Sequence, residues 1–267
     1  MSAASEGKRR RLADEAGMAL DKPGMQPPAS EQEARHDLAA LFRLADEFGW
    51  TDITSTHISA RIPGSSDAFL MNGYDELYSE ITASSLCRVG MDGKMHTSGR
   101  PLNHAGYEIH SAVLRGRPDV NFVIHTHTHA SIAVGCSPEG LRPLSQHALT
   151  LLGTLSRHAY QDSTAVTNEG EALVRDLGGN MCCLLENHGL LVVGRTAAEA
   201  FAYHRYLEDA CRIQVQILSC TKSPIEISRK AAESTIDWGR PENGPIGNTP
   251  WPALLRLLKK KAPGYDD

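Results

Sequence analysis

The sequence predicts one α/β domain, in which helices pack in layers against a central β-sheet. Segments typical of strands and of helices alternate along most of the chain, a pattern found in layered α/β domains. The 267 residues are 41% hydrophobic and 22% charged, which is typical of a soluble globular protein that buries a large core. We place this domain at residues 30–240, between a disordered leader (residues 1–29) and a C-terminal tail (residues 241–267).

The first part of the domain is expected to be a helix followed by short strands. Ser30 to Glu33 match a helix-capping box, and apolar residues follow at helical spacing until Gly49. The expected strands are short and separated by turn residues; they lie at residues 57–62, at 67–72 and on either side of a turn within 86–95.

The second part alternates helices with buried strands. The expected helices lie at residues 104–115, from about 130 to 134, at 167–177 and from the capping box at 196–199 to about 220. The expected strands are apolar runs at residues 120–127, 181–185 and 190–193. Residues 143–160 show no pattern that favours a helix or a strand.

The two ends of the chain differ from the domain in composition. The leader is polar and contains the basic run from Lys8 to Arg11, which we interpret as a solvated tail, with a nucleic-acid or targeting patch as the alternative. The tail is rich in Pro and Gly and ends in a short basic helix at residues 251–261.

Charge and cysteine usage bound the function. A net charge of -5 gives no reason to expect nucleic-acid binding, and no apolar run approaches the length of a membrane span. The N-terminus lacks the apolar segment of a secretory signal. The six cysteines show no C-x-x-C spacing and are expected to be reduced core thiols, so a cytoplasmic location is the default.

The strongest functional signal is the segment from Val120 to His129. It has the β-branched, apolar character of a buried strand and ends with histidine at every second position. Because side chains alternate faces along a strand, His125 and His127 are expected to share one face while Thr126 points to the other. Two imidazoles on one face at the end of a strand make half of a metal site.

A third ligand is expected at His188, between the two apolar strands near residue 188. Enzymatic zinc sites commonly use three protein ligands and keep one position open for substrate or water. The three histidines could supply three neutral nitrogens to such a site. The alternative is that they are surface or core histidines with ordinary hydrogen bonds.

With these motifs in place, the chain resembles the class II aldolase/adducin family. The matching segments are residues 117–121 leading into His125-Thr126-His127, then residues 186–190, then residues 196–201. The resemblance covers residues 32–220 and implies a three-layer α/β/α domain around a mostly antiparallel mixed sheet. It also implies a divalent metal on the three histidines, and a fourfold-symmetric tetramer with active sites between subunits.

The chain departs from the family's sugar-phosphate aldolases at the substrate end. Gly106 stands where those aldolases carry their catalytic glutamate, and Thr56-His57 and His104-Ala105 replace residues that hold the substrate phosphate. The tyrosine that a neighbouring subunit offers as proton donor falls at His147. These departures favour a carboxylate substrate without phosphate.

Other residues are assigned to the site by position. His57 and Arg61 share a strand face and could bind a carboxylate, with a packing histidine and a solvated arginine as the alternative. Asn103 and His104 border the site or cap the helix that follows. The remaining site candidates are His147 as an acid or base and Glu186 as a carboxylate that orients a ligand histidine.

The other histidines are expected to be structural. The chain is expected to bend into a helix at His129, so this residue is not counted as a ligand. The five assigned to structural roles are His36, His96, His110, His158 and His204.

Together these features predict a divalent-metal-dependent carbon–carbon lyase, of the aldolase or decarboxylase type. Its substrate would be a small non-phosphorylated oxo or hydroxy acid, with no nucleic-acid or membrane partner. Zn(II) is the preferred metal, and Mn(II) or Fe(II) are alternatives, because three histidines do not choose between them. An Fe(II)-dependent oxygenase or decarboxylase of an aromatic oxo acid and a non-catalytic module like the adducin head are the competing functions.

Overall fold

A computed structural model describes residues 23–96, 99–161 and 166–267 of the chain. The basic run at residues 8–11 lies outside the described residues. Within the described part, none of the helices combines the length and the apolar character needed to cross a bilayer.

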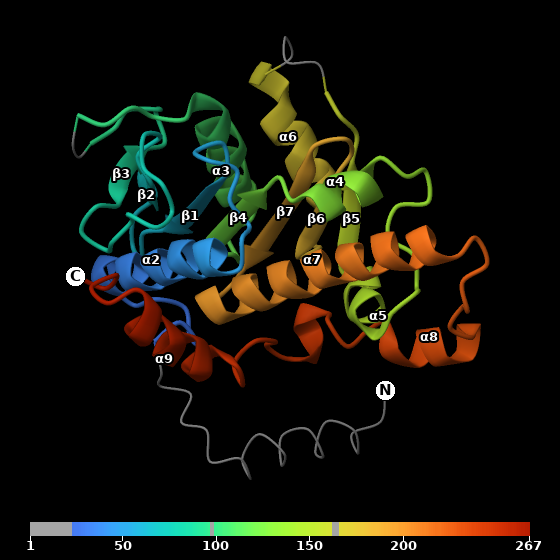
Figure 1. The fold of residues 1–267 in the computed structure, drawn as a ribbon. Helices are drawn as coiled ribbons and strands as arrows, with labels where there is room; N and C mark the ends of the chain where they lie inside the picture. Colours follow the sequence, from blue (N-terminus) through green and yellow to red (C-terminus); the bar gives the residue numbers. More distant parts are fainter. Residues whose placement is uncertain (1–22, 97–98, 162–165) are drawn as a thin grey trace.

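A seven-stranded sheet forms the centre of the domain (Figure 1). Its strands are β1 (His57–Arg61), β2 (Ala68–Met71), β3 (Cys87–Gly90), β4 (Phe122–Thr126), β5 (Leu155–His158), β6 (Cys182–Leu185) and β7 (Gly189–Gly194). They lie in the order β3-β2-β1-β4-β7-β6-β5, and every neighbouring pair is antiparallel except β5 with β6. The predicted mixed, mostly antiparallel sheet is therefore confirmed.

Helices cover both faces of this sheet. The helices are α2 (Glu31–Glu47), α3 (His104–Gly116), α4 (His129–Gly135), α5 (Gln146–Leu152), α6 (Val166–Leu177), α7 (Ala197–Cys220), α8 (Arg229–Thr235), η2 (Pro241–Asn243) and α9 (Trp251–Lys261). Helices α2 and α7 run across one face, and α3 and α6 pack together on the other (Figure 1). The predicted three-layer arrangement is thus confirmed, and β1 and β4 lie at its centre.

The predicted helix starts form as capped helices. The Ser30 side chain accepts a hydrogen bond from the Glu33 amide, and the Thr196 side chain accepts one from Glu199, so each cap satisfies an amide that the helix leaves free. Residues 143–160, which had no predicted element, form α5 and β5. The β5 strand is only partly buried over Leu155–Arg157, which explains why no clear pattern marks it.

The described ends of the chain pack on the domain. The indole N–H of Trp251 donates to the Pro23 carbonyl at 2.9 Å, and the Ala198 amide donates to the Gly24 carbonyl at 2.9 Å. Met25 and Trp251 are both buried. Residues 23–29 and the helix of the tail therefore belong to the folded body, and the predicted leader boundary at residue 29 lies within it.

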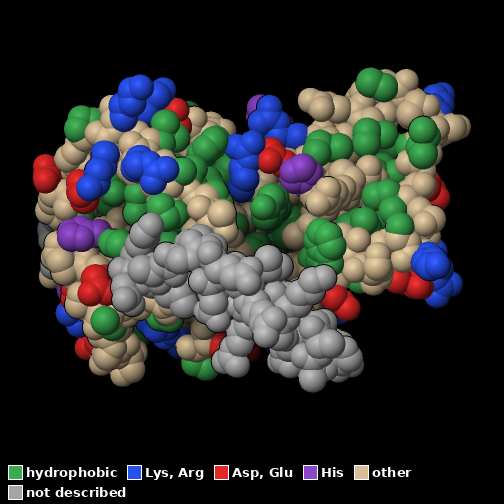
Figure 2. Space-filling view, turned by 90° about the horizontal axis from the view of Figure 1, so that it is seen from below, with side chains coloured by type: hydrophobic (Ala, Val, Ile, Leu, Met, Phe, Trp, Pro, Cys, Tyr) green, Lys and Arg blue, Asp and Glu red, His purple; other side chains and the backbone are tan. Residues whose placement is uncertain are grey.

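The six cysteines form no disulfide bonds, and charges of both signs are mixed on the described part of one face. All six cysteines are free thiols; Cys87, Cys182, Cys183 and Cys211 are buried, whereas Cys136 and Cys220 are exposed. Figure 2 shows acidic and basic side chains interspersed on the described part of one face, so this part presents no continuous basic surface.

Asp37 is a buried carboxyl in α2, and its ionisation should govern part of the stability. Burial, reinforced by the charge of Glu33, raises the pKa of Asp37 to about 7, against an opposing hydrogen bond from the Gly24 amide. A folded-state pKa above the unfolded value means that the folded protein binds the proton more tightly. The free energy of unfolding should therefore fall as the pH rises from about 4 to about 7.

We expect Asp37→Asn to remove this pH-dependent loss of stability, because asparagine does not ionise. Its side-chain oxygen still offers an acceptor to the Gly24 amide. At pH 8 the variant should be more stable than the parent by on the order of 1–3 kcal/mol, and at pH 4 the difference should be small. Urea unfolding at both pH values measures it, with the exposed Asp46→Asn on the same helix as control. A gain that is equal at both pH values would contradict the assignment.

Candidate metal centre

Three histidines from two segments, 61 residues apart between His127 and His188, meet at one end of β4. Strands β4 and β7 are antiparallel neighbours in which Thr126 faces Leu190, so the turn before β7 lies beside the end of β4. His188 is the last residue of that turn. Sheet pairing therefore brings His188 next to His125 and His127.

The sequence Asn187-His188-Gly189 suits this turn for separate reasons. Asn187 has a φ of 57°, in the left-handed region that asparagine tolerates better than most residues. A Cβ at Gly189 would lie 2.2 Å from the Thr126 carbonyl oxygen, so the close approach of β7 to β4 requires glycine here. The two flanking residues thus fix the position of the histidine between them.

The alternation predicted for the histidine strand is confirmed. The Thr126 hydroxyl lies 2.7 Å from Nε2 of His204, which belongs to α7 on one face of the sheet. His125 points to the opposite face, where α3 lies, and its ring is 4.7 Å from the ring of His127. Trp50 packs on His204 with a ring separation of 4.1 Å, which supports the strand from behind.

The three rings direct their Nε2 atoms at one another. Nε2 of His127 lies 2.9 Å from Nε2 of His125 and 3.1 Å from Nε2 of His188. Among the described residues these three form the one group of potential ligands close enough for a metal, and their ligand atoms lie within 4.8 Å of one another.

The hydrogen bonds on the far side of two rings determine which nitrogens carry protons. Nδ1 of His125 donates to the Leu190 carbonyl at 2.9 Å, and Nδ1 of His127 donates to the Asp52 carboxylate at 3.0 Å. In the neutral rings both Nε2 atoms are therefore bare, and their lone pairs face each other across 2.9 Å. A divalent cation held by these nitrogens would turn this repulsion into coordination, so the residues fit a bound metal.

The electrostatic environment keeps two of the ligands neutral. Burial, together with the neighbouring histidines His57, His188 and His127, lowers the pKa of His125 well below its ordinary value. Burial, followed by the charges of His127 and His158, lowers the pKa of His188 to about 4. Neutral imidazole is the form that binds a metal.

A second pair of histidines lies against the triad. Nδ1 of His57 and Nε2 of His110 share a hydrogen bond of 2.8 Å, and Nδ1 of His110 is hydrogen-bonded to the Ser59 hydroxyl. The ring of His57 lies 4.8 Å from that of His125, so His57 lies beside the triad. His110, predicted to be structural, is the residue that holds it.

Gly106 explains how His57 fits. A Cβ at position 106 would lie 2.8 Å from Cδ2 of His57 and 2.8 Å from the terminal methyl of Met71. Any larger side chain would therefore collide with the imidazole. The ring of His57 fills the space next to the position where the aldolases carry their glutamate.

The structure corrects two of the predicted roles. Arg61 lies four residues along β1 from His57, and its guanidinium donates to the carbonyls of Leu114, Arg117 and Val120. It closes the C-terminal end of α3 and does not reach the triad. Glu186 pairs with Arg157 at 2.8 Å, so its carboxylate is engaged away from the ligand rings.

The remaining predicted residues lie at the start of α3 and on α5. Asn103 caps α3 by accepting from the Gly106 amide at 3.0 Å, and His104 is the exposed first residue of that helix. His147 lies on α5 with its ring 5.8 Å from that of Tyr206. Helix α5 is below α7 in Figure 1, whereas α4, which follows the triad segment, is above it.

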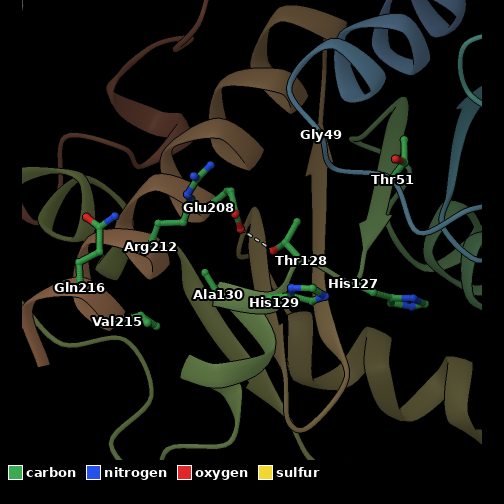
Figure 3. A pocket seen from close by; sticks show the side chains of 10 residues that line it. All are labelled: Gly49, Thr51, His127, Thr128, His129, Ala130, Glu208, Arg212, Val215 and Gln216. Carbon is green, nitrogen blue, oxygen red and sulfur yellow. Dashed lines mark hydrogen bonds between the residues drawn. The ribbon is translucent and has the colours of Figure 1, made fainter. Parts of the chain in front are cut away.

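Three residues at the site had no sequence signal. Asp52 orients His127 from a loop 75 residues away. Tyr160 is exposed, with its ring 6.3 Å from that of His188. Arg212 lines a cavity of about 480 Å³ that extends from His127 along α7 (Figure 3).

Both polar and apolar side chains line that cavity. Glu208 accepts a hydrogen bond from Thr128, as Figure 3 shows, and burial raises the pKa of its carboxyl group. The full lining is Gly49, Thr51, His127, Thr128, His129, Ala130, Glu208, Arg212, Val215 and Gln216. His129 is exposed and lies in this wall rather than in the triad, in agreement with its exclusion as a ligand.

Comparison with known proteins identifies related chains. Residues 36–215 match the model of the class II aldolase and adducin N-terminal domain. A protein of the aldolase class 2 type from Caulobacter vibrioides is 42% identical over 243 residues, which cover 89% of this chain and 93% of the relative. The crystal structure of an aldolase II superfamily protein from Pseudomonas syringae has a TM-score of 0.84 at 38% identity and covers 90% of this chain and 97% of its own.

Adducins are also similar to this chain. Mouse alpha-adducin is 36% identical over 244 residues, which cover 85% of this chain and 33% of the adducin. The chain thus corresponds to about a third of that protein.

We expect His188→Ala to lose most of its bound metal without unfolding. The residue lies in a surface turn and is only partly buried, so truncation removes a ligand but little packing. Elemental analysis after purification and a thermal melt measure the two effects, with the exposed His129→Ala as the matched control. Normal metal content in His188→Ala would show that the ligand assignment is wrong.

Proposed function

The chain belongs to the class II aldolase and adducin family, and on this premise we propose that it is a divalent-metal-dependent carbon–carbon lyase. Its reaction would be of the aldolase or decarboxylase type, and its substrate a small non-phosphorylated oxo or hydroxy acid. The observation that carries the proposal is the pair of bare Nε2 atoms of His125 and His127, 2.9 Å apart, with His188 beside them.

The metal would be held by these three histidines, with Zn(II) preferred and Mn(II) or Fe(II) as alternatives. When bound, it would act as a Lewis acid at the substrate oxygen that receives the electron pair of the breaking carbon–carbon bond. The hydrogen bonds from the rings to Leu190 and Asp52 keep two ligands oriented for it.

His57 is the proposed acid or base in place of the missing glutamate. Its Nδ1 is hydrogen-bonded to Nε2 of His110, which leaves its own Nε2 for a substrate. Retro-aldol cleavage removes a proton from a substrate hydroxyl, whereas decarboxylation must return a proton to carbon. The free Nε2 of His57 is the atom available for either transfer, and burial keeps the ring neutral by lowering its pKa.

Arg212 takes over the carboxylate-binding role that had been predicted for Arg61. It lines a cavity on the α7 side of His127, and the His127 ring points away from that cavity (Figure 3), so a substrate at the triad would have to extend past the end of β4 to bring its second polar group to the guanidinium. Because burial raises the pKa of Glu208 in the same cavity, that carboxyl competes less strongly for the cation. The residues that line the cavity do not call for a phosphate group on the substrate.

His147 is proposed to serve the site of a neighbouring subunit. Within its own chain it lies on α5, on the other side of α7 from the triad segment (Figure 1). The family resemblance assigns its position to a proton donor that reaches across a subunit boundary. We therefore propose a homotetramer with cyclic symmetry and active sites between subunits.

The similarity to alpha-adducin supports a second candidate, a non-catalytic interaction module. The two candidates differ in whether the triad holds a metal. A module without catalysis has no need of two unprotonated imidazole nitrogens facing each other in a buried site, which favours the enzyme.

The test begins with metal analysis and activity of the purified chain. We expect bound divalent metal, and turnover of one or more 2-oxo or 2-hydroxy acids from a panel, detected as released carbon dioxide or aldehyde and abolished by chelation. Oxygen consumption by protein loaded anaerobically with Fe(II) would identify the oxygenase instead. No bound metal and no affinity for Zn(II), Mn(II) or Fe(II) would leave the interaction module.

In the same assay, His57→Gln should reduce kcat by about 10²–10⁴ while metal content stays normal, because an acid or base is lost and no ligand is. His36→Gln is the control, since that side chain bonds to Gln32 on the outer surface of α2. Unchanged kcat in His57→Gln would remove this residue from the mechanism.

Mixing two inactive variants tests the subunit boundary. His147→Ala and His188→Ala should each be inactive alone, but mixed tetramers should recover about a quarter of the parent activity, because some sites then combine an intact triad with an intact His147. Light scattering establishes the tetramer. If the mixture stays inactive although subunits exchange, His147 does not serve a neighbouring site.

A further inference from the structure

His158 is a buried histidine with an assigned proton. It is the last residue of β5 and is 4% exposed, and its Nδ1 lies 2.6 Å from the Asp176 carboxylate on α6. A carboxylate accepts, so Nδ1 of His158 is the donor and carries the hydrogen. In the neutral ring Nε2 is then a bare acceptor.

That acceptor has no partner within the described chain. Nε2 of His158 is fully buried and makes no hydrogen bond to a described residue. Buried polar atoms in native proteins are almost always paired with protein or with ordered water, so this atom requires an explanation.

The space next to His158 contains His188. Both rings line the same small cavity, together with Leu173 and Tyr160, and the volume of this cavity is about 10 Å³. That volume corresponds to about one water molecule. The backbone also joins the two segments, because the Glu186 amide donates to the His158 carbonyl at 2.9 Å and β5 pairs with β6 up to Leu185.

If the three Nε2 atoms hold a metal, His188 has one ring nitrogen left for a hydrogen bond. Nε2 of His188 is the atom 3.1 Å from Nε2 of His127, so a metal bound by the three Nε2 atoms leaves Nδ1 of His188 as an N–H donor. The other two ligands already donate their Nδ1–H groups, to Leu190 and Asp52. Glu186 was expected to accept the hydrogen bond from the third histidine, His188, but it pairs with Arg157.

We propose that Asp176 and His158 position the third ligand through one buried water. The Nδ1–H of His188 would donate to the water, the water to Nε2 of His158, and Nδ1–H of His158 to Asp176. Each ligand histidine then has its own acceptor: a backbone carbonyl, a carboxylate and a histidine–carboxylate pair. This inference rests on the proposed metal site, and it makes His158 and Asp176 positioning residues that do not touch substrate.

The variant that tests this is His158→Phe, which keeps a ring in the cavity and removes the acceptor. We expect its affinity for Zn(II), measured by competition with a chromophoric chelator, to fall by about 10–100-fold. His158→Gln, whose amide oxygen can accept, should recover part of the loss. Leu173→Met lines the same cavity without changing its polar groups and should bind Zn(II) like the parent.

A second measurement uses the parent protein alone, so it holds even if the Phe variant does not fold. In zinc-loaded, ¹⁵N-labelled protein, His158 should be the Nδ1–H tautomer, and the Nδ1 proton of His188 should exchange slowly with solvent. In His158→Phe that proton should exchange fast, which a packing role alone would not cause. A parent His158 with its proton on Nε2, or equal zinc affinity in the Phe variant, would overturn the inference.

The failures of the two proposals can be told apart. A parent protein that binds no zinc removes the metal site itself. A parent that binds zinc, together with a His158→Phe variant that binds it equally well, removes only the positioning role.

Discussion

The site depends on one constraint: two imidazole lone pairs are held face to face by hydrogen bonds on the far side of each ring. The donor bonds of His125 and His127 leave their Nε2 atoms bare at 2.9 Å. Such an arrangement is unfavourable by itself, so the surrounding structure must stabilise it. Leu190 accepts from a strand paired with β4, and Thr126 is fixed by His204 of α7, so sheet pairing and helix packing offset the repulsion. A divalent cation bound here would meet nitrogens that are already oriented.

The sequence was sufficient for the fold, and for the pairing of His125 with His127 on one side of the chain, because both follow periodic patterns. Alternation along β4 separates His125 from Thr126, and capping boxes mark the starts of α2 and α7. The antiparallel pairing that joins His188 to the other two ligands followed from the family resemblance and not from spacing. Where no pattern existed, as at residues 143–160, the elements α5 and β5 were not predicted.

The predictions that were wrong assumed that residues sharing a strand face also share a site. Arg61 is on the same face as His57, but four strand residues span about 13 Å, so it reaches the other end of α3. Glu186 is two residues from His188, but the residue between them is in the left-handed conformation, so strand alternation does not apply. Asp52 orients His127 from a loop whose approach only the folded chain reveals.

The departures from the aldolase pattern make physical sense together. Loss of a glutamate and gain of a histidine at separate positions could be unrelated changes in a scaffold without catalysis. In the structure the two positions are in contact. A Cβ added at Gly106 would lie 2.8 Å from Cδ2 of His57, so the imidazole occupies the space that a side chain at position 106 would need. The pair of His110 and Ser59 then holds the ring in place against the triad. Gly106 thus admits a hydrogen-bonded imidazole next to the triad, and under the proposed function His57 would replace one proton-transfer group by another.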